Sequence, residues 1–462
     1  MILGLLFAGA GGWLAFRESG PKRPDILIVV WDTCRADRLS AYGHPVETTP
    51  WLSRFAKDAV LFKEAFAPSP CTPPSHGSLF TGLLPRNHGL RQGLGDRLHP
   101  GIPTLAQTLR SAGYETVGFT ANSFISGVTG LDAGFDRMVP VYLDDPGTGW
   151  GRAERVLAAV DAWLEERAAA SSSRRARPVF AFVNLMDVHL PRTPPPEDLA
   201  FVVGPQGVNP VILQAVAVES RDAAAHVFGI KKVDDATVAA MAPVYDAAVR
   251  HLDRSTGLLL DKLHAASLLQ DGVVAVVGDH GDHLGEHGLL SHEMTLYDPV
   301  LRIPMVVRWP GRLDGGRVET AQVRLQDLYP TLLEAARVPI PPGTGLNSKP
   351  LTESPLPNRV LRAEYDRPTA FLPLAQRAFE GTSPEHFQKF YVTIHAVQDP
   401  AGPRGPRKLI RYVREGGVGP PEPDRYELFD FRADPGETKD LLQAGAPEEK
   451  AEAERLRGLI HR

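Results

Sequence analysis

The sequence predicts an α/β protein with a mainly parallel sheet flanked by helices, followed by a smaller antiparallel C-terminal subdomain. Several segments are continuously apolar, as in strands covered on both faces, and stretches with helical periodicity separate them. Beyond about residue 343 the pattern changes to shorter strands. At 462 residues, of which 43% are hydrophobic, the chain is long enough for a large core and two subdomains.

The main sheet is predicted to contain five strands, at residues 25–31, 114–120, 178–185, 272–278 and 301–311. Helices are predicted at 49–56, 104–112, 152–169, 239–263 and 325–336. The first of these helices starts with Thr49 and Pro50, residue types that favour a helix N-terminus. Residues 193–235 are first Pro-rich and then weakly patterned, which predicts an insertion or lid. The C-terminal part is predicted to hold strands at 390–396 and 408–413 and a helix at 447–460.

The predicted organisation has three segments: 1–23, a signal or membrane-anchor segment with a linker; 24–342, a catalytic domain; and 343–462, the C-terminal subdomain. Residues 1–16 are apolar and uncharged, which is short for a bilayer span and typical of a signal-peptide core or short anchor. Because no basic segment or clear cleavage site accompanies them, an uncleaved anchor is favoured. We therefore expect an extracytoplasmic location, periplasmic or membrane-anchored. A misassigned start codon or a buried first strand is the alternative.

Composition argues against nucleic-acid binding and against sites built from several cysteines. The 50 basic and 55 acidic residues are interspersed and give a net charge of −5, which argues against nucleic acid as a partner, because phosphate backbones require a clustered basic face. Cys34 and Cys71 are the only cysteines, so the sequence has no disulfide framework and no cysteine-rich zinc site. A single bridge between these two cysteines is possible.

Acidic residues and histidines come directly after three predicted strands. The carboxyl ends of parallel strands form the ligand-binding edge of such a sheet, so these groups are expected to meet there. With Thr72 and His292 added, the set contains seven groups: Asp32, Thr72, Asp187, His189, Asp279, His280 and His292. Carboxylates and imidazoles suit one or two divalent ions, and without thiolates the choice among zinc, manganese, calcium and magnesium stays open.

Thr72 lies in a Pro-rich stretch, residues 70–82, that leads into a predicted helix. Prolines around Cys71 and Thr72 favour an extended approach to the helix N-terminus, whose N–H groups and partial positive charge suit an anionic substrate. A divalent ion lowers the pKa of a coordinated oxygen, so a metal would make the Thr72 hydroxyl a nucleophile. The helix N-terminus is expected to bind the remaining substrate oxygens.

Several motifs resemble those of the sulfatase family within the alkaline phosphatase superfamily. Residues 277–288, Val-Gly-Asp-His-Gly-Asp-His-Leu-Gly-Glu-His-Gly, are similar to the family signature, and 75–82, 182–191 and 426–430 match further blocks in family order. The resemblance extends over about residues 24–442. It implies an alkaline-phosphatase-like α/β fold and a metal-dependent ester hydrolase.

Three departures from the sulfatase pattern affect the expected chemistry. Sulfatases carry Cys-x-Pro-x-Arg, whose cysteine becomes formylglycine, but counting back from Thr81-Gly82 puts Thr72 at the nucleophile position and His76 at the arginine position. The lysine and histidine that hold sulfate are absent after residue 120, where the chain has Ala121-Asn122, and Thr33 replaces an aspartate. These departures favour a phosphate mono- or diester as substrate over a sulfate ester.

The resemblance also implies roles for individual residues. Asp32, Asp279, His280 and Thr72 match one metal site. The three residues proposed for a second metal, or for protonating the leaving group, are Asp187, His189 and His292. Asn122 is expected to contact a non-bridging oxygen, and His76 to replace an arginine that supports the nucleophile. Asp282, His283, His287 and His88 are expected to be structural.

Three alternatives remain open: a sulfatase, an envelope transferase that moves a phospho-alcohol, and a binding protein that keeps the fold without turnover. The expected substrate is a small-molecule, glycan or lipid ester. Asp32, Asp279 and His280 argue against the binding protein, because they retain a complete set of metal ligands.

Overall fold

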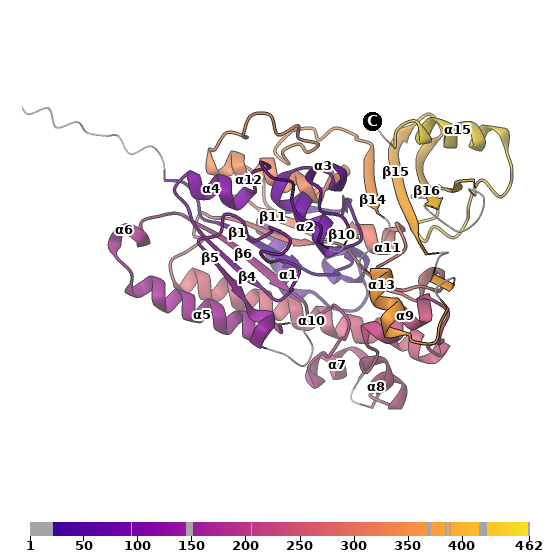
Figure 1. The fold of residues 1–462 in the computed structure, drawn as a ribbon. Coiled ribbons are helices and arrows are strands. Elements are labelled where there is room, and N and C mark those ends of the chain that lie inside the picture. The colour runs from indigo at the N-terminus through magenta and orange to yellow at the C-terminus, as the bar shows by residue number, and fades with distance from the viewer. Residues whose placement is uncertain are drawn as a thin grey trace, which may run out of the picture.

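The computed structural model describes residues 22–460 except 94, 145–150, 205, 367–370, 384–385, 388–389 and 415–422. Its centre is an eight-stranded sheet in the order β12-β2-β11-β7-β1-β6-β4-β5 (Figure 1). The bounds of these strands, in sheet order, are Val318–Glu319, Val60–Phe62, Met305–Arg308, Val273–Gly278, Ile26–Trp31, Val179–Leu185, Glu115–Thr120 and Arg137–Pro140. The predicted fold class is confirmed.

The middle of the sheet is parallel and buried. Strand β1 pairs in parallel with β6 on one side and with β7 on the other, and all residues of these three strands are buried. The register places Trp31 beside both Leu185 and Gly278, so the three strands end at the same level. Residues just past the three strands are therefore brought to one edge of the sheet.

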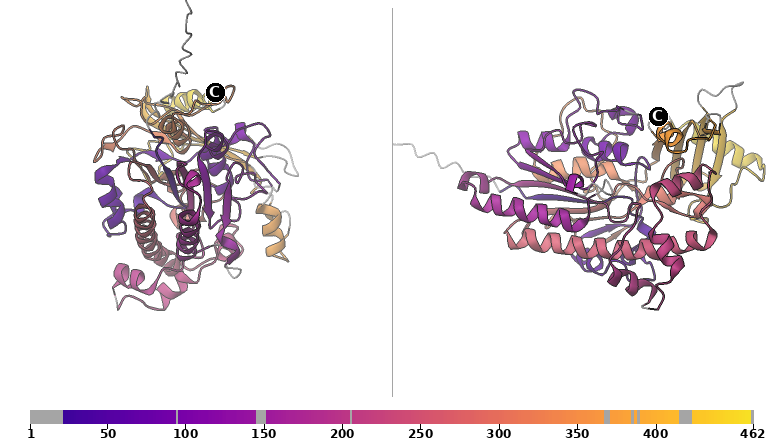
Figure 2. Two further views of the ribbon diagram at one scale, coloured as in Figure 1. Left: turned by 90° about the vertical axis from the view of Figure 1, so that its left-hand side faces the viewer. Right: turned by 60° about the horizontal axis from the view of Figure 1, so that its bottom comes forward.

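Helices cover both faces of the sheet (Figure 2). One face packs against α5 (Ala153–Ala169) and α10 (Asp235–Ala265), and the other against α2 (Thr72–Thr81), α4 (Leu105–Ser111) and α12 (Leu328–Ala336). Successive side chains of β1 point to opposite faces of the sheet and so enter two different hydrophobic cores. Leu27 and Val29 belong to the α10 side, and Ile28 belongs to the α2 side.

Two predicted elements differ from the structure. The predicted fifth strand, 301–311, is interrupted at Pro304, because proline cannot donate to a strand ladder. It forms the short β10 (Arg302–Ile303) and β11, and β11 runs antiparallel to β7. Helix α10 is longer at both ends than predicted and contains Pro243.

The insertion and the remaining short elements surround this core. Residues 193–235 form three helices, α7 (Pro196–Val203), α8 (Pro210–Val216) and α9 (Ser220–Val227). The other short helices are α1 (Pro50–Phe55), α3 (Pro85–His88), α6 (Ser172–Arg175), α11 (Asp298–Leu301) and α13 (Phe371–Ala378). The other short strands are β3 (Ala65–Phe66), β8 (His283–Leu284), β9 (Leu290–Ser291) and β13 (Val323–Arg324).

The expected N-terminal anchor, residues 1–16, lies outside the described residues. Within the part of the chain that the structure describes, no helix is long and apolar enough to cross a bilayer. The signal or anchor segment and the segment boundaries at 23 and 342 stay predictions.

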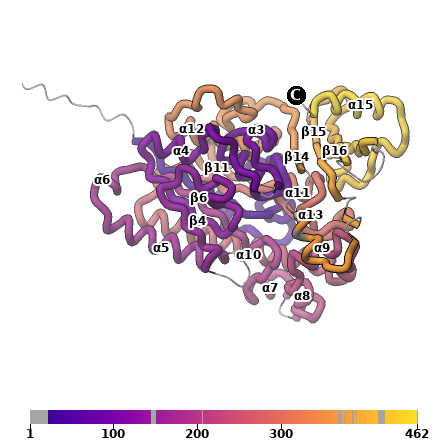
Figure 3. Tube along the Cα trace, in the orientation of Figure 1, coloured from indigo at the N-terminus to yellow at the C-terminus, as the bar shows by residue number. Residues whose placement is uncertain are grey.

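The C-terminal subdomain is an antiparallel sheet of β14 (Leu361–Tyr365), β15 (Val392–Gly402), β16 (Gly405–Arg414) and β17 (Arg425–Phe429), with α15 (Pro447–Arg457) packed on it. It stands at one end of the main sheet, beside α11 (Figure 3). A buried ion pair joins the two parts. The Lys408 ammonium on β16 lies 2.6 Å from the Asp298 carboxylate at the start of α11 and 2.7 Å from that of Glu437.

Replacing Lys408 by methionine should destabilise the fold by about 3–5 kcal/mol, because two buried carboxylates would lose their cation. Urea denaturation of the Lys408→Met variant measures this cost. The matched control is Lys450→Met on α15, where the lysine is exposed and a change of within about 0.5 kcal/mol is expected. An unchanged midpoint for Lys408→Met would show that the ion pair does not hold the subdomain.

Candidate active site

Two buried carboxylates form the centre of the site. Asp32 comes directly after β1 and Asp279 directly after β7, and both side chains are fully buried. Asp279 Oδ1 accepts hydrogen bonds from the backbone N–H groups of Thr33 at 3.1 Å and His280 at 2.8 Å. Asp32 Oδ1 and Asp279 Oδ2 have no hydrogen-bond partner. Buried carboxylate oxygens without partners fit a cation that would complete them.

His280 completes a set of three possible metal ligands. One ligand atom each from Asp32, Asp279 and His280 lie within 4.8 Å of one another. His280 Nδ1 lies 3.0 Å from the carbonyl oxygen of Gly281, to which it donates in the tautomer that leaves the Nε2 lone pair free. Two carboxylates and one imidazole are a donor set that divalent ions accept.

The electrostatics of the three groups favour the same conclusion. Burial, together with the neighbouring Asp279 carboxylate, raises the pKa of Asp32 to about 7. Burial likewise raises the pKa of Asp279 to about 7 and lowers the pKa of His280 to about 4. The protein alone thus stabilises neither two charged carboxylates nor a charged imidazole here. A bound cation would supply the missing positive charge.

Thr72, and not Cys71, faces this cluster. The Thr72 Oγ1 atom lies 3.3 Å from His280 Nε2 and 3.4 Å from Asn122 Nδ2. Cys71 precedes helix α2 with extended backbone angles, and its side chain packs in an apolar cluster with Phe66 and Tyr365. The Thr72 hydroxyl therefore lies beside His280, whereas the Cys71 side chain belongs to an apolar cluster.

The N-terminus of α2 offers fewer N–H groups than expected. Thr72 is the first residue of the helix, and Pro73 and Pro74 have no N–H. The next N–H, that of Ser75, donates to the carbonyl oxygen of Cys71 at 3.1 Å. The predicted binding of several substrate oxygens by these amides is therefore wrong, because two are absent and the next is used within the helix.

Two asparagine side chains hold Asp32 in place. Asn122, after β4, donates to Asp32 Oδ2 at 2.9 Å, and Asn184, near the end of β6, donates to the same oxygen at 3.1 Å. Asn122 was expected to contact substrate, and the structure adds this positioning role. Asn184 was missed. It is a polar residue within a predicted apolar strand, which is the signal that could have identified it.

His76 lies one turn after Thr72 in α2 and contacts its backbone. Its Nδ1 atom lies 3.0 Å from the carbonyl oxygen of Thr72 and 3.5 Å from Asp279 Oδ2. The ring packs against the rings of Phe80 and Phe182. Burial lowers the pKa of His76 to about 3, so this histidine is neutral, unlike the arginine whose position it occupies.

His189 and His292 lie near the cluster of Asp32, Asp279 and His280. The His292 ring centroid lies 4.6 Å from that of His280 and 5.5 Å from that of His189. Asp282 Oδ1 lies 3.5 Å from His292 Nδ1, and a buried ion pair joins Asp282 to Arg192. Asp282, which was expected to be a loop residue only, thus contacts His292 directly. Arg192 was not identified from the sequence.

Asp187 does not join His189 and His292 as expected. Its Oδ1 atom accepts a hydrogen bond from the backbone N–H of Ala153 at 3.2 Å and lies 3.5 Å from His251 Nε2. The carboxylate therefore turns toward α10, away from the proposed grouping. Asp187 is the second residue past the end of β6, and the backbone path of this short segment decides the direction.

Both cysteine thiols are free and buried. Cys34 packs in the core on the α10 side of the sheet, whereas Cys71 packs against the C-terminal sheet. The proposed bridge between them is absent from the structure because the two side chains enter different apolar clusters.

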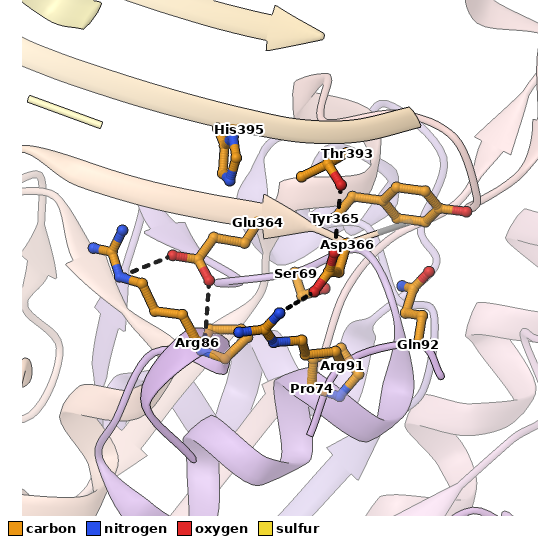
Figure 4. Close-up of a pocket in the computed structure, with 11 residues that line it drawn as sticks. Ser69, Pro74, Arg86, Arg91, Gln92, Glu364, Tyr365, Asp366, Thr393 and His395 are labelled. Atoms are coloured by element: carbon orange, nitrogen blue, oxygen red, sulfur yellow. Dashed lines mark hydrogen bonds and ion pairs between the residues drawn. The ribbon is translucent and has the colours of Figure 1, made fainter. Parts of the chain in front are cut away.

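Two cavities adjoin the site. One, of about 420 Å³, is lined by Met186, His189 and the Pro-rich residues 193–196. The other, of about 180 Å³, is lined by Ser69 and Pro74 and reaches the C-terminal sheet (Figure 4). In it Arg86 pairs with Glu364, and Arg91 pairs with Asp366. Charged side chains form part of the wall of each cavity.

Comparison with known proteins agrees with this geometry. The family model described as Sulfatase matches residues 24–338. The chain is 26% identical to the steryl-sulfatase of Mus musculus over 92% of this chain and 80% of that protein. It is 24% identical to the ulvan-active sulfatase of Formosa agariphila over 71% of this chain, and it spans only 64% of that protein's length. The crystal structure of the phosphonate monoester hydrolase of Agrobacterium radiobacter superposes with a TM-score of 0.69 at 19% identity, covering 93% of each chain.

The similarity to solved structures establishes the fold, and the family model covers well over half of the chain. The chain therefore belongs to the sulfatase family, a group of ester hydrolases within the alkaline phosphatase superfamily.

Proposed function

We propose that this protein is a metal-dependent hydrolase of phosphate or phosphonate esters that uses Thr72 as its nucleophile. One observation carries the proposal: the Thr72 hydroxyl lies 3.3 Å from His280 Nε2, whereas the Cys71 side chain packs among apolar residues. A cysteine in that environment is poorly placed to become a formylglycine nucleophile. Burial also raises the pKa of the Cys71 thiol well above its usual range.

The ion would be held by Asp32, Asp279 and His280, with Thr72 Oγ1 beside them. A divalent ion at this position lowers the pKa of a bound hydroxyl and offsets negative charge on the substrate. Asn122 and Asn184 orient the Asp32 carboxylate by donating to Oδ2, which leaves Oδ1 to bind the ion. His76 holds the backbone carbonyl of Thr72 and so fixes the first turn of α2.

His189 and His292 are the candidates for protonating the leaving group. His189 lines the 420 Å³ cavity, and its ring centroid lies 5.5 Å from that of His292, which in turn lies 4.6 Å from that of His280. Asp282 contacts His292 Nδ1 and holds its ring. The cavity that His189 lines would accommodate the leaving alcohol, and His292 adjoins both His189 and His280.

The phosphate preference rests on the residues just past the end of β4. Asn122 occupies the region where sulfatases carry the lysine and histidine that hold sulfate, and its amide is committed to Asp32. The structural similarity to a phosphonate monoester hydrolase supports the same class of substrate. A sulfate ester is the second candidate, favoured by the sulfatases among the relatives. An envelope phospho-alcohol transferase, and an extracytoplasmic location, remain proposals that rest on the N-terminal sequence.

Thr72→Ala should lower kcat by about 10³-fold or more, because the proposed nucleophile is lost while Asp32, Asp279 and His280 remain. Cys71→Ser is the matched control and should keep most of the activity. Both variants are compared by initial rates at saturating p-nitrophenyl ester, with circular dichroism to check folding. An inactive Cys71→Ser variant together with an active Thr72→Ala variant would return the nucleophile to the cysteine.

Removal of divalent metal by a chelator should abolish turnover, and added Zn²⁺ or Mn²⁺ should restore it, because Asp32 and Asp279 each have a buried carboxylate oxygen without a hydrogen-bond partner. Activity is measured before and after dialysis and again with each metal. Asp279→Asn should not be rescued at the same metal concentration. Full activity of a preparation shown by mass spectrometry to be metal-free would contradict the proposal.

A panel of esters tests the substrate class. We expect p-nitrophenyl phosphate, bis-p-nitrophenyl phosphate or p-nitrophenyl phenylphosphonate to be cleaved with at least about tenfold higher kcat/KM than p-nitrophenyl sulfate, a difference of about 1.4 kcal/mol in the barrier. The shared leaving group makes the comparison direct. A higher value for the sulfate would identify a sulfatase, and no cleavage of any ester would argue against a hydrolase.

A further inference from the structure

A second group of possible metal ligands lies apart from Asp32, Asp279 and His280. It consists of Glu154 at the start of α5, Asp187 after β6 and His251 in the middle of α10. One ligand atom from each of the three lies within 4.8 Å of the others. His251 Nε2 is 3.1 Å from Glu154 Oε1 and 3.5 Å from Asp187 Oδ1.

Asp187 supplies an independent indication of a ligand. Its side chain is only 9% exposed. Oδ1 accepts the backbone N–H of Ala153, but Oδ2 is buried and has no hydrogen-bond partner. An unpaired carboxylate oxygen at this depth is costly unless a cation or a donor completes it.

The three residues line the 420 Å³ cavity. The cavity gives an ion an entry path and room for water or a substrate oxygen as further ligands. It also extends to His189, so this second group shares a cavity with the proposed catalytic site.

We propose that Glu154, Asp187 and His251 bind a second divalent cation, Zn²⁺ or Mn²⁺. Two carboxylates and one imidazole form a donor set that both ions accept. The ion would lie beside His251 Nε2, which is 3.1 Å from Glu154 Oε1 and 3.5 Å from Asp187 Oδ1.

The surroundings of His251 allow this change. Its Nδ1 atom lies 3.7 Å from Asp198 Oδ2, and the Arg254 guanidinium donates both to that oxygen at 2.8 Å and to Nδ1 at 3.2 Å. When Nε2 binds the ion, the imidazole hydrogen lies on Nδ1, 3.7 Å from Asp198 Oδ2. Nδ1 then no longer accepts a hydrogen bond from Arg254, and the guanidinium keeps only its bond to Asp198. Such a carboxylate behind a histidine ligand is common at metal sites.

The test is the number of ions bound per chain. Metal-depleted full-length protein is dialysed against Zn²⁺ or, separately, Mn²⁺, and bound metal is measured by inductively coupled plasma mass spectrometry. His251→Gln and Asp187→Asn should each bind one ion fewer than the wild type, with affinity at this site reduced by about 100-fold or more. The matched control is His264→Gln, a second histidine on α10, and should bind as many ions as the wild type.

This difference does not depend on the proposed catalytic metal. If the catalytic site also binds an ion, the wild type holds two and His251→Gln holds one; if it does not, the numbers are one and none. Asp279→Asn distinguishes these cases. Thermal melting without metal checks that each variant folds. Equal metal content in wild type, His251→Gln and Asp187→Asn would overturn the second site.

Discussion

The structure depends on holding two carboxylates together in its interior. Parallel pairing of β1 and β7 places Trp31 beside Gly278, so Asp32 and Asp279, one residue further along, emerge side by side. Both are fully buried, and burial raises the pKa of each. Two asparagine amides, two backbone N–H groups and a neutral histidine surround them, yet one oxygen of each carboxylate remains without a partner. A cation would complete the arrangement, and this is the reason for proposing the chemistry at this edge of the sheet.

Residues 71 and 72 show how two adjacent side chains can enter different surroundings. Cys71 and Thr72 are adjacent, but extended backbone at Cys71 and the start of α2 at Thr72 direct their side chains differently. The thiol enters an apolar cluster shared with the C-terminal sheet, and the hydroxyl enters the polar cluster. The C-terminal sheet thus helps to form the apolar surroundings of the Cys71 thiol. The buried ion pair of Lys408 connects that sheet to α11.

A residue at the same sheet edge, Asp187, belongs to a second cluster that includes His251 of helix α10. Residues after β6 include both His189, which approaches His292, and Asp187, which turns toward His251 on α10. The long helix α10 reaches the edge because its buried face packs along the sheet, with Trp31 Nε1 donating to Thr256 Oγ1 at 2.8 Å. One cavity is lined by His189 as well as by Asp187 and His251. The proposed second metal site and a residue of the proposed catalytic site therefore face the same space.

The sequence by itself determined the fold class, four central strands to within a residue or two, and the convergence of Asp32, Asp279, His280 and Thr72, because apolar runs define parallel strands and their ends share one edge. It also indicated Thr72 through the spacing to Thr81-Gly82. Only the tertiary structure decided the direction of Asp187, the contribution of Asn184, the break at Pro304 and the separation of the two thiols. These features depend on side-chain directions and on contacts between residues distant in sequence, which no local pattern specifies.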